Sequence, residues 1–151
     1  MSKQLSIVIP LFNEEESLPE LFSWIKKVLS DHYTFEVIFV DDGSKDNSWS
    51  IIESLKTKHS EVRGIKFQRN YGKSAALQKG FELCEGDVVV TMDADLQDDP
   101  AEIPSLISKI NEGFDLVSGW KKIRHDPWNK TFPSKIFNFF TRLLTGVKIH
   151  D

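Results

Sequence analysis

The sequence has little cysteine, no long apolar run and no excess of positive charge. A single cysteine, Cys84, in 151 residues excludes a disulfide framework and a cysteine-rich metal site. No window reaches the ~18 apolar residues that a membrane-spanning helix needs, and the N-terminal apolar run is too short for a signal peptide. The formal net charge of −4 argues against a general nucleic-acid binder. We therefore expect a cytoplasmic chain that binds no nucleic acid.

Two familiar phosphate-binding signatures are also missing. The triplet Gly72-Lys73-Ser74 resembles the end of a P-loop, but Phe67 stands where the P-loop needs its first glycine. No GxGxxG occurs anywhere in the sequence, which weakens a dinucleotide-binding interpretation. Gly72 and Lys73 at the start of a helix can nevertheless hold an anion.

The order of the expected elements predicts the α/β class. Short β-branched runs alternate with helical apolar spacing over residues 1–151, without repeat or linker, so we expect one domain with a mostly parallel sheet and helices on both faces. The expected strands are residues 5–10, 35–40, 62–67, 87–92 and 114–118. Helices are expected after Asn13, after Asp46 or Asn47, over 74–84, from Asp99-Pro100 to Gly113, and over 134–145.

Two further features of this fold are expected. The valine-rich strand at 87–92 should lie in the centre of the sheet. The sequence stops after a strand-like VKIH run with neither cap nor turn, so we expect the fold to be C-terminally incomplete and the chain to be the front part of a longer protein.

Polar residues gather where the expected strands end, which is where parallel sheets bind ligands. The four segments concerned are residues 10–14, 41–46, 70–74 and 93–99. Residues 86–100 contain five aspartates and no basic residue, whereas residues 120–150 are rich in lysine and arginine. This distribution predicts a cation site beside an anion site, with two solvated faces as the alternative.

Asp93 and Asp95 directly follow the fourth expected strand. Two carboxylates ~4 Å apart repel each other by about 4 kcal/mol at an effective dielectric of ~20, unless a cation intervenes. Mg²⁺ takes one or two carboxylates and completes its shell with water and substrate phosphates. The pair therefore predicts a metal–diphosphate site, and a capped turn is the alternative.

Asp41 directly follows the second expected strand. A carboxylate there can accept a hydrogen bond from a nucleobase or a ribose hydroxyl. The same position suits the phospho-acceptor of a receiver-like signalling domain, at Asp41 or Asp42. That alternative predicts no nucleotide affinity and leaves the Asp93–Asp95 pair unexplained.

A basic segment at residues 119–128 carries Arg124 between two tryptophans. It is either a loop that grips a phosphate or a lipid-linked substrate, or a solvated loop with aromatic anchors. The amphipathic stretch at 134–145 can pack on the core or lie against a bilayer surface.

Several motifs stand in one order: VIPLFNEEESL, VIFVDDGSKDNS, RNYGKSAAL, MDADLQDDPAEIP, VSGWKKIRHD and SKIFN. Through them, residues 5–151 resemble family 2 glycosyltransferases with a GT-A fold, in the branch of dolichol-phosphate mannose synthase and bacterial polyprenyl-phosphate sugar transferases. The resemblance implies inverting, metal-dependent transfer of a sugar from a UDP- or GDP-sugar to a polyprenyl or dolichyl phosphate. One alternative is a glycan hydroxyl acceptor in cell-envelope polysaccharide synthesis. Another is a nucleotide-sugar-binding module without turnover.

The resemblance also implies roles for the donor site. Four residues would line the pocket for the base and the ribose: Pro10, Asn13, Glu14 and Asp41. Asp93 would lie near the ribose and diphosphate, and with Asp95 and Gln97 would hold the Mg²⁺ or Mn²⁺ that bridges the diphosphate. Lys73 would support this pocket.

The resemblance places the acceptor near Arg124 and Lys130, which would meet its phosphate. A polyprenyl phosphate is already anionic near pH 7, because the second pKa of a phosphomonoester is ~6, so transfer to it needs no strong base. A hydroxyl acceptor would need a carboxylate base, for which Asp151, the aspartate that opens the next segment of the family's pattern, is the candidate. A lipid acceptor would bring the full-length protein to the cytoplasmic face of a membrane.

Overall fold

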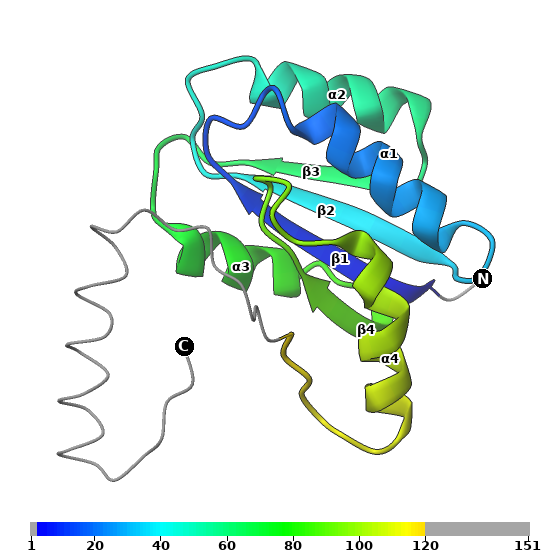
Figure 1. The fold of residues 1–151 in the computed structure, drawn as a ribbon. Helices are drawn as coiled ribbons and strands as arrows, with labels where there is room; N and C mark the ends of the chain where they lie inside the picture. The colour runs from blue at the N-terminus through cyan, green and yellow to red at the C-terminus, as the bar shows by residue number, and fades with distance from the viewer. Residues whose placement is uncertain (1–2, 120–151) are drawn as a thin grey trace, which may run out of the picture. The chain divides into compact units, whose positions relative to one another are not determined.

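The computed structural model describes residues 3–119 (Figure 1). Its strands are β1 Lys3–Leu11, β2 Phe35–Asp41, β3 Val62–Lys66 and β4 Gly86–Thr91. Its helices are α1 Leu18–Leu29, α2 Ser48–Lys58, α3 Lys73–Phe81, the 3₁₀ helix η1 Pro100–Glu102 and α4 Ile103–Asn111. The chain divides into two compact units, Met1–Val117 and Ser118–Asp151, and the first is described below. The helix expected at 134–145 and the sites expected at Arg124, Lys130 and Asp151 lie outside the described residues.

The four strands form one parallel sheet in the order β3-β2-β1-β4. Val8 of β1 lies between Ile38 of β2 and Thr91 of β4. All four strands therefore end at the same edge, where the expected polar segments leave the sheet. This confirms the parallel sheet predicted from the sequence.

Helices cover both faces of the sheet, as predicted (Figure 1). One face packs against α1, α2 and α4 in the larger core, to which β1 contributes Leu5, Ile7 and Ile9. The other face packs against α3, which comes so close to β1 that a Cβ at Gly80 would lie 2.3 Å from Val8 Cγ1. Alternation along β1 thus divides its side chains between the two cores.

Helix α1 is anchored by five apolar residues at helical spacing, all of them buried: Leu18, Leu21, Phe22, Ile25 and Leu29. Each such side chain stabilises the fold by roughly 1.5–3 kcal/mol relative to exposure. The predicted apolar face is therefore correct, but the predicted start is wrong. The helix begins at Leu18 after Ser17, because Asn13 adopts a left-handed backbone with φ 58° and does not cap it.

The other helix ends follow the sequence more closely. Asp99 Oδ1 accepts a hydrogen bond from the Ala101 N–H at 2.8 Å, as expected of a cap before Pro100. Gly113, with φ 102°, ends α4 as predicted.

Two expectations about the sheet are wrong within the described residues. Strand β4 pairs only with β1 there and is not central, and exposed positions such as Val89 alternate with half-buried ones along it. A valine run fits a half-covered strand as well as a buried one, so the run alone does not fix the position. Residues 114–118 form no strand, and Phe114 and Leu116 are exposed.

The part of the chain that the structure describes contains no helix long and apolar enough to span a bilayer.

A buried polar network holds the amino-terminal ends of the strands together. Glu36 of β2 is fully buried and accepts hydrogen bonds from Ser6 Oγ at 2.7 Å, Arg63 Nη1 at 2.9 Å and the Glu85 N–H at 2.8 Å. The hydrogen bond to Glu36 raises the pKa of Arg63. The network links the three strands β1, β2 and β3 to the segment that enters β4, and so fixes the frame from which the opposite ends project.

Candidate functional site

The carboxyl-terminal ends of the strands surround a cavity of about 400 Å³. Its lining comes from the four polar segments that the sequence predicted: Pro10, Leu11, Phe12, Glu14, Asp42, Asn70, Gly72, Lys73, Asp93, Ala94 and Asp95. Segments that are distant in the sequence meet here because the strands are parallel and end together.

Two neighbouring loops are bound to each other at one side of the cavity. The Asn13 N–H donates to Ser44 Oγ at 2.9 Å, and Asn13 Oδ1 accepts from the Lys45 N–H at 2.8 Å. The Glu14 N–H donates to Ser48 Oγ at 2.9 Å. Asn13 therefore bridges the two loops through hydrogen bonds and does not line the cavity, whereas Glu14 does line it. The left-handed backbone of Asn13 suits this role, because asparagine tolerates that conformation better than most residues.

Asp46 strengthens the same junction. Its Oδ2 accepts from the Glu15 N–H at 3.1 Å and its Oδ1 accepts from the Ser48 N–H at 3.0 Å. Partial burial acts to raise the pKa of Asp46, but the hydrogen bonds from Ser48 and Glu15 outweigh it and lower the pKa below the ordinary 3.8. Of the two predicted candidates, Asn47 stands at the N-cap position of α2 without a side-chain cap hydrogen bond, and Asp46, the residue before it, holds the N–H of Ser48.

Asp41 and Asp42 play different parts although they are adjacent. Asp42 lines the cavity, and its two oxygens accept from the N–H groups of Tyr71 at 2.7 Å and Gly72 at 2.9 Å. Asp41 is fully buried and does not line the cavity. Its Oδ1 accepts from the Ser44 N–H at 2.7 Å, and its Oδ2 has no hydrogen-bond partner among residues 3–119.

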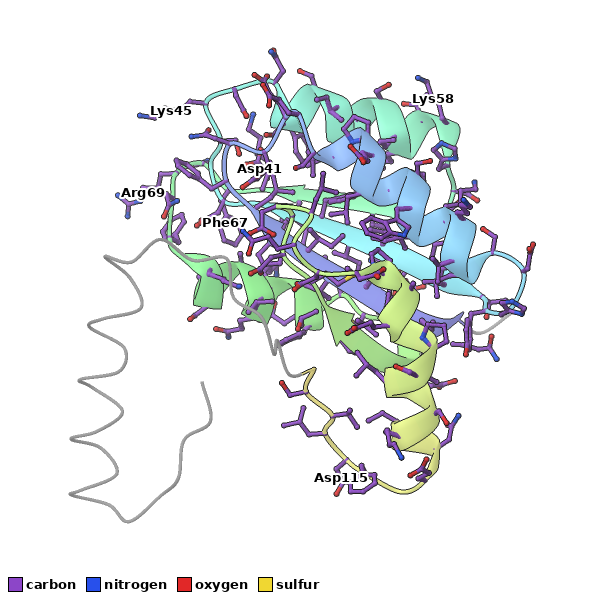
Figure 2. The ribbon with its side chains drawn as sticks, viewed as in Figure 1. Asp41, Lys45, Lys58, Phe67, Arg69 and Asp115 are labelled. Atoms are coloured by element: carbon purple, nitrogen blue, oxygen red, sulfur yellow. The ribbon has the colours of Figure 1, made fainter. Side chains whose placement is uncertain are left out.

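Figure 2 shows the setting of this carboxylate. Asp41 lies inside the molecule near Phe67, and Lys45 and Arg69 point outward at the periphery. The Arg69 guanidinium lies 4.9 Å from the ring centroid of Tyr71, whose ring meets that of Phe67 edge to face at 5.6 Å. These stacked side chains support the segment that carries Asn70 to the cavity.

The turn after β4 presents Asp93 and Asp95 to the cavity. The Asp93 N–H donates to Asp98 Oδ2 at 3.0 Å, and the Gln97 N–H donates to Asp95 Oδ1 at 3.1 Å. Leu96 between them has φ 61°, a strained backbone for leucine that the compact turn requires. Gln97 is exposed and does not line the cavity, so the structure brings together the two aspartates but not the glutamine.

Lys73 forms an ion pair with Asp93 across the cavity. Lys73 begins α3, and Asp93 follows β4, so the pair joins the two segments that the sequence assigned to an anion and a cation. The ammonium group of Lys73 thus lines the cavity together with four carboxylates, those of Glu14, Asp42, Asp93 and Asp95.

The carboxylates of Asp93 and Asp95 can be compared with the ligands that a divalent metal needs. Nowhere in residues 3–119 do three or more histidine, cysteine or acidic side chains gather as a metal site. Asp93 and Asp95 alone supply two carboxylates, which is the set that Mg²⁺ or Mn²⁺ uses when substrate phosphates complete the shell. The residues fit a metal that binds together with a diphosphate.

Five residues of the lining are not among the site residues predicted from the sequence, namely Leu11, Phe12, Asp42, Asn70 and Ala94. All five lie in segments that the strand-end rule had selected. Choosing among neighbours within such a segment needs the path of the loop, which the rule does not give.

Comparison with known proteins identifies the family to which the sequence is similar. The sequence model of the family described as "Glycosyl transferase family 2" matches residues 6–151. The undecaprenyl-phosphate 4-deoxy-4-formamido-L-arabinose transferase of Shewanella sediminis is 44% identical over 97% of this chain and 45% of its own length. The protein of the same name from Pseudomonas fluorescens SBW25 is 43% identical over 97% of this chain and 44% of its own length. The chain therefore spans about half the length of these relatives.

Solved structures show the same fold. Mannosyltransferase PcManGT from Pyrobaculum calidifontis, in complex with GDP-Man and Mn²⁺, aligns with a TM-score of 0.56 at 24% identity, over 63% of this chain and 28% of its own. Residues 1–349 of TarS from S. aureus align with a TM-score of 0.62 at 20% identity, over 82% of this chain and 40% of that one. At such identities the likeness concerns the fold alone.

Proposed function

The chain belongs to glycosyl transferase family 2 and has the GT-A fold that its sequence predicted, and we propose that its cavity binds the nucleoside diphosphate of a sugar donor. The observation that carries the proposal is the cavity itself, where Lys73 faces the paired carboxylates Asp93 and Asp95. An ammonium group for phosphate beside two carboxylates for a divalent cation suits a metal–diphosphate. GDP-Man with Mn²⁺ in PcManGT and UDP-GlcNAc in TarS are ligands of the same class on this fold.

The family argues against the receiver-like alternative, and the burial of Asp41 agrees with this. A phospho-acceptor must be reached by a phosphoryl donor, but Asp41 is fully buried away from the cavity. Asp42 lines the cavity, but both of its oxygens hold backbone N–H groups.

Within the donor site, we assign the base and the ribose to the side formed by Pro10, Glu14 and Asp42. These residues line the cavity. Asp41 lies behind them and holds the turn at Ser44, and Asn13 acts indirectly by fixing the loop that presents Glu14. The contacts that the base makes with this side of the cavity determine whether the donor carries uracil or guanine.

Asp93 and Asp95 would hold Mg²⁺ or Mn²⁺ at the diphosphate. When bound, such an ion acts as a Lewis acid that stabilises the departing nucleoside diphosphate without a protonated residue. Lys73 adds positive charge on the facing wall of the cavity, and Gln97 fixes Asp95 through its backbone N–H.

The acceptor we propose is a polyprenyl phosphate. The relatives named above act on undecaprenyl phosphate, and they are 44% and 43% identical to this chain. The acceptor phosphate is an anionic nucleophile, and its in-line attack would invert the anomeric centre. Arg124 and Lys130 remain the residues predicted to hold it, at the cytoplasmic face of a membrane. With a glycan hydroxyl as acceptor, Asp151 remains the predicted base.

A thermal-shift panel tests donor binding. The wild-type chain is melted with UDP or GDP in the presence of Mn²⁺ or EDTA, alongside Asp95→Asn and the matched control Asp87→Asn, which lies on β4 away from the cavity lining. A ligand at ~100 times its Kd stabilises by about 2.7 kcal/mol. We expect a Mn²⁺-dependent shift that Asp95→Asn loses and Asp87→Asn keeps. A cooperative melt with no shift for either nucleotide would contradict the proposal.

Transfer is tested separately from binding. The chain is incubated with the donor that binds and with detergent-solubilised undecaprenyl phosphate, alongside the Shewanella sediminis relative as a positive control, and lipid-linked sugar is counted. Product from the chain supports the lipid acceptor. Donor binding without product from the 151-residue chain would identify it as a binding module without turnover.

A further inference from the structure

The ion pair between Lys73 and Asp93 occupies one of the two carboxylates that we assign to the metal. The backbone on either side of the pair is fixed. Gly72, which precedes Lys73, donates its N–H to Asp42 at 2.9 Å, and the Asp93 N–H donates to Asp98 at 3.0 Å. A change of partner at this pair therefore needs only side-chain rotation.

The pair is open to solvent. The side chain of Lys73 is 60% exposed and that of Asp93 is 43% exposed. Ion pairs this exposed contribute little to stability, so stronger partners displace them readily. A divalent cation carries twice the charge of the ammonium group and ligates a carboxylate directly. A diphosphate likewise offers Lys73 more negative charge than one carboxylate does.

We propose that Lys73 is a displaceable counter-ion, which competes with the divalent metal for Asp93 and passes to the diphosphate when the nucleotide binds. This inference rests on the proposed function. Metal alone meets the ammonium group at Asp93, where Lys73 holds Oδ1, so it must displace Lys73 or bind beside its positive charge. Nucleotide alone must draw Lys73 away and leave the carboxylates of Asp93 and Asp95 facing its phosphates. When both ligands bind, Lys73 faces the diphosphate, and Asp93 and Asp95 face the metal.

The consequence is positive cooperativity between metal and nucleotide. Each ligand removes an obstacle to the other, and by linkage the factor by which nucleotide tightens metal binding equals the factor by which metal tightens nucleotide binding. The ion pair would thus keep Asp93 from holding a metal ion before a donor arrives.

The test measures Mn²⁺ binding to the chain by titration with detection of free Mn²⁺, with and without the nucleotide that the wild type binds. In Lys73→Gln we expect Mn²⁺ alone to bind about 2- to 5-fold more tightly, since its competitor is gone. Nucleotide in EDTA should bind more weakly, since a phosphate partner is gone. The factor by which saturating nucleotide tightens Mn²⁺ should fall.

Two variants control for charge and for the site. Lys79→Gln removes the same charge from the same helix, where Lys79 pairs with Glu82 and does not line the cavity, so Mn²⁺ affinity should stay at the wild-type value. In an Asp93→Asn background, Lys73→Gln should no longer tighten Mn²⁺ binding, because the carboxylate under competition is absent.

The inference is overturned if Lys73→Gln binds Mn²⁺ alone no more tightly than wild type, including the case in which neither protein binds Mn²⁺. It is also overturned if Lys79→Gln tightens Mn²⁺ binding as much. Failure of the proposed function is a different result, in which wild type binds neither UDP nor GDP with Mn²⁺ present.

Discussion

Strand β2 carries a fully buried carboxylate near each end, and the two have opposite surroundings. Glu36, near the amino-terminal end, accepts hydrogen bonds from Ser6, Arg63 and the Glu85 N–H. Asp41, at the carboxyl-terminal end, has one oxygen held by the Ser44 N–H and the other without a partner in the described part of the chain. A buried polar atom without a partner destabilises a fold by about 1–3 kcal/mol.

Backbone strain also differs between the amino-terminal and carboxyl-terminal ends of the sheet. In the described part of the chain, the two residues other than glycine with positive φ are Asn13 and Leu96, and both lie in loops at the carboxyl-terminal edge. Strain of this kind costs about 1–3 kcal/mol per residue and gathers at functional sites. The amino-terminal end of the sheet thus stabilises the fold, and the carboxyl-terminal end holds the polar groups that a ligand can use.

The largest expected effect is the loss of stability when the amino-terminal network is broken. Glu36→Ala removes the buried acceptor of the Ser6 hydroxyl, of the Glu85 N–H and of Arg63, so the free energy of unfolding should fall by about 3 kcal/mol. Urea unfolding measures it. Glu85→Ala removes only the exposed partner of the same arginine and should cost under about 1 kcal/mol. Equal losses in the two variants would show that the network is not what stabilises this end.

At the carboxyl-terminal end, a change in a turn should impair the site more than the fold. A Cβ at Gly43 would lie 2.5 Å from the backbone carbon of Arg69, so Gly43→Ala must displace the segment that carries Asn70 to the cavity. We expect a loss of about 2 kcal/mol and weaker nucleotide binding. Gly113→Ala introduces similar backbone strain at φ +102° with nothing within 4 Å, and should cost about 1 kcal/mol without affecting nucleotide binding. Unchanged nucleotide affinity in Gly43→Ala would refute this account of the turn.

Asp41 should respond in the opposite direction to Glu36. Asp41→Asn keeps an oxygen for the Ser44 N–H and removes a buried negative charge, so the free energy of unfolding should stay level or rise by up to about 1 kcal/mol. Thermal unfolding at neutral pH measures whether the free energy of unfolding rises or falls. If Asp41→Asn lowered the free energy of unfolding as much as Glu36→Ala does, both carboxylates would stabilise the fold, and the comparison would fail.

The smallest effect concerns pH. The folded-state pKa of Asp46 lies below its ordinary 3.8, so the stability that the carboxylate contributes is present above 3.8 and is lost as the pH falls through the lowered value. The difference in unfolding free energy between wild type and Asp46→Asn should therefore shrink from neutral pH toward acid. A difference that stays constant below 3.8 would contradict the assignment.

The sequence predicted the four strands of the sheet and the buried helix face, but it did not predict all the loop residues that line the cavity. The β-branched runs and the spacing of residues such as Leu21 and Ile25 located the strands and the buried face of α1, because these patterns depend on local geometry. The strand-end rule located all four cavity segments. Which neighbour lines the cavity, Asp41 or Asp42, depends on how the loop turns after the strand, and local pattern does not determine that.

Pairings across the sheet were beyond the sequence for a similar reason. Glu36 stands in the otherwise apolar run of β2, and its partner Arg63 lies in the next strand, so only the register brings them together. Asn13 was predicted as a cap because asparagine caps helices well, but the same side chain also tolerates a left-handed backbone and holds a neighbouring loop.

One measurement tests the central claim most directly, namely that the carboxyl-terminal cavity binds nucleotide and metal together. Amide spectra of the ¹⁵N-labelled chain are recorded with UDP or GDP, first with Mg²⁺ and then with a small fraction of Mn²⁺, whose unpaired electrons broaden nearby signals. The account predicts nucleotide-dependent broadening at Gly72, Lys73 and Asp95, and sharp signals at Glu36 and Gly86. Broadening at the amino-terminal end, or none that depends on nucleotide, would contradict it.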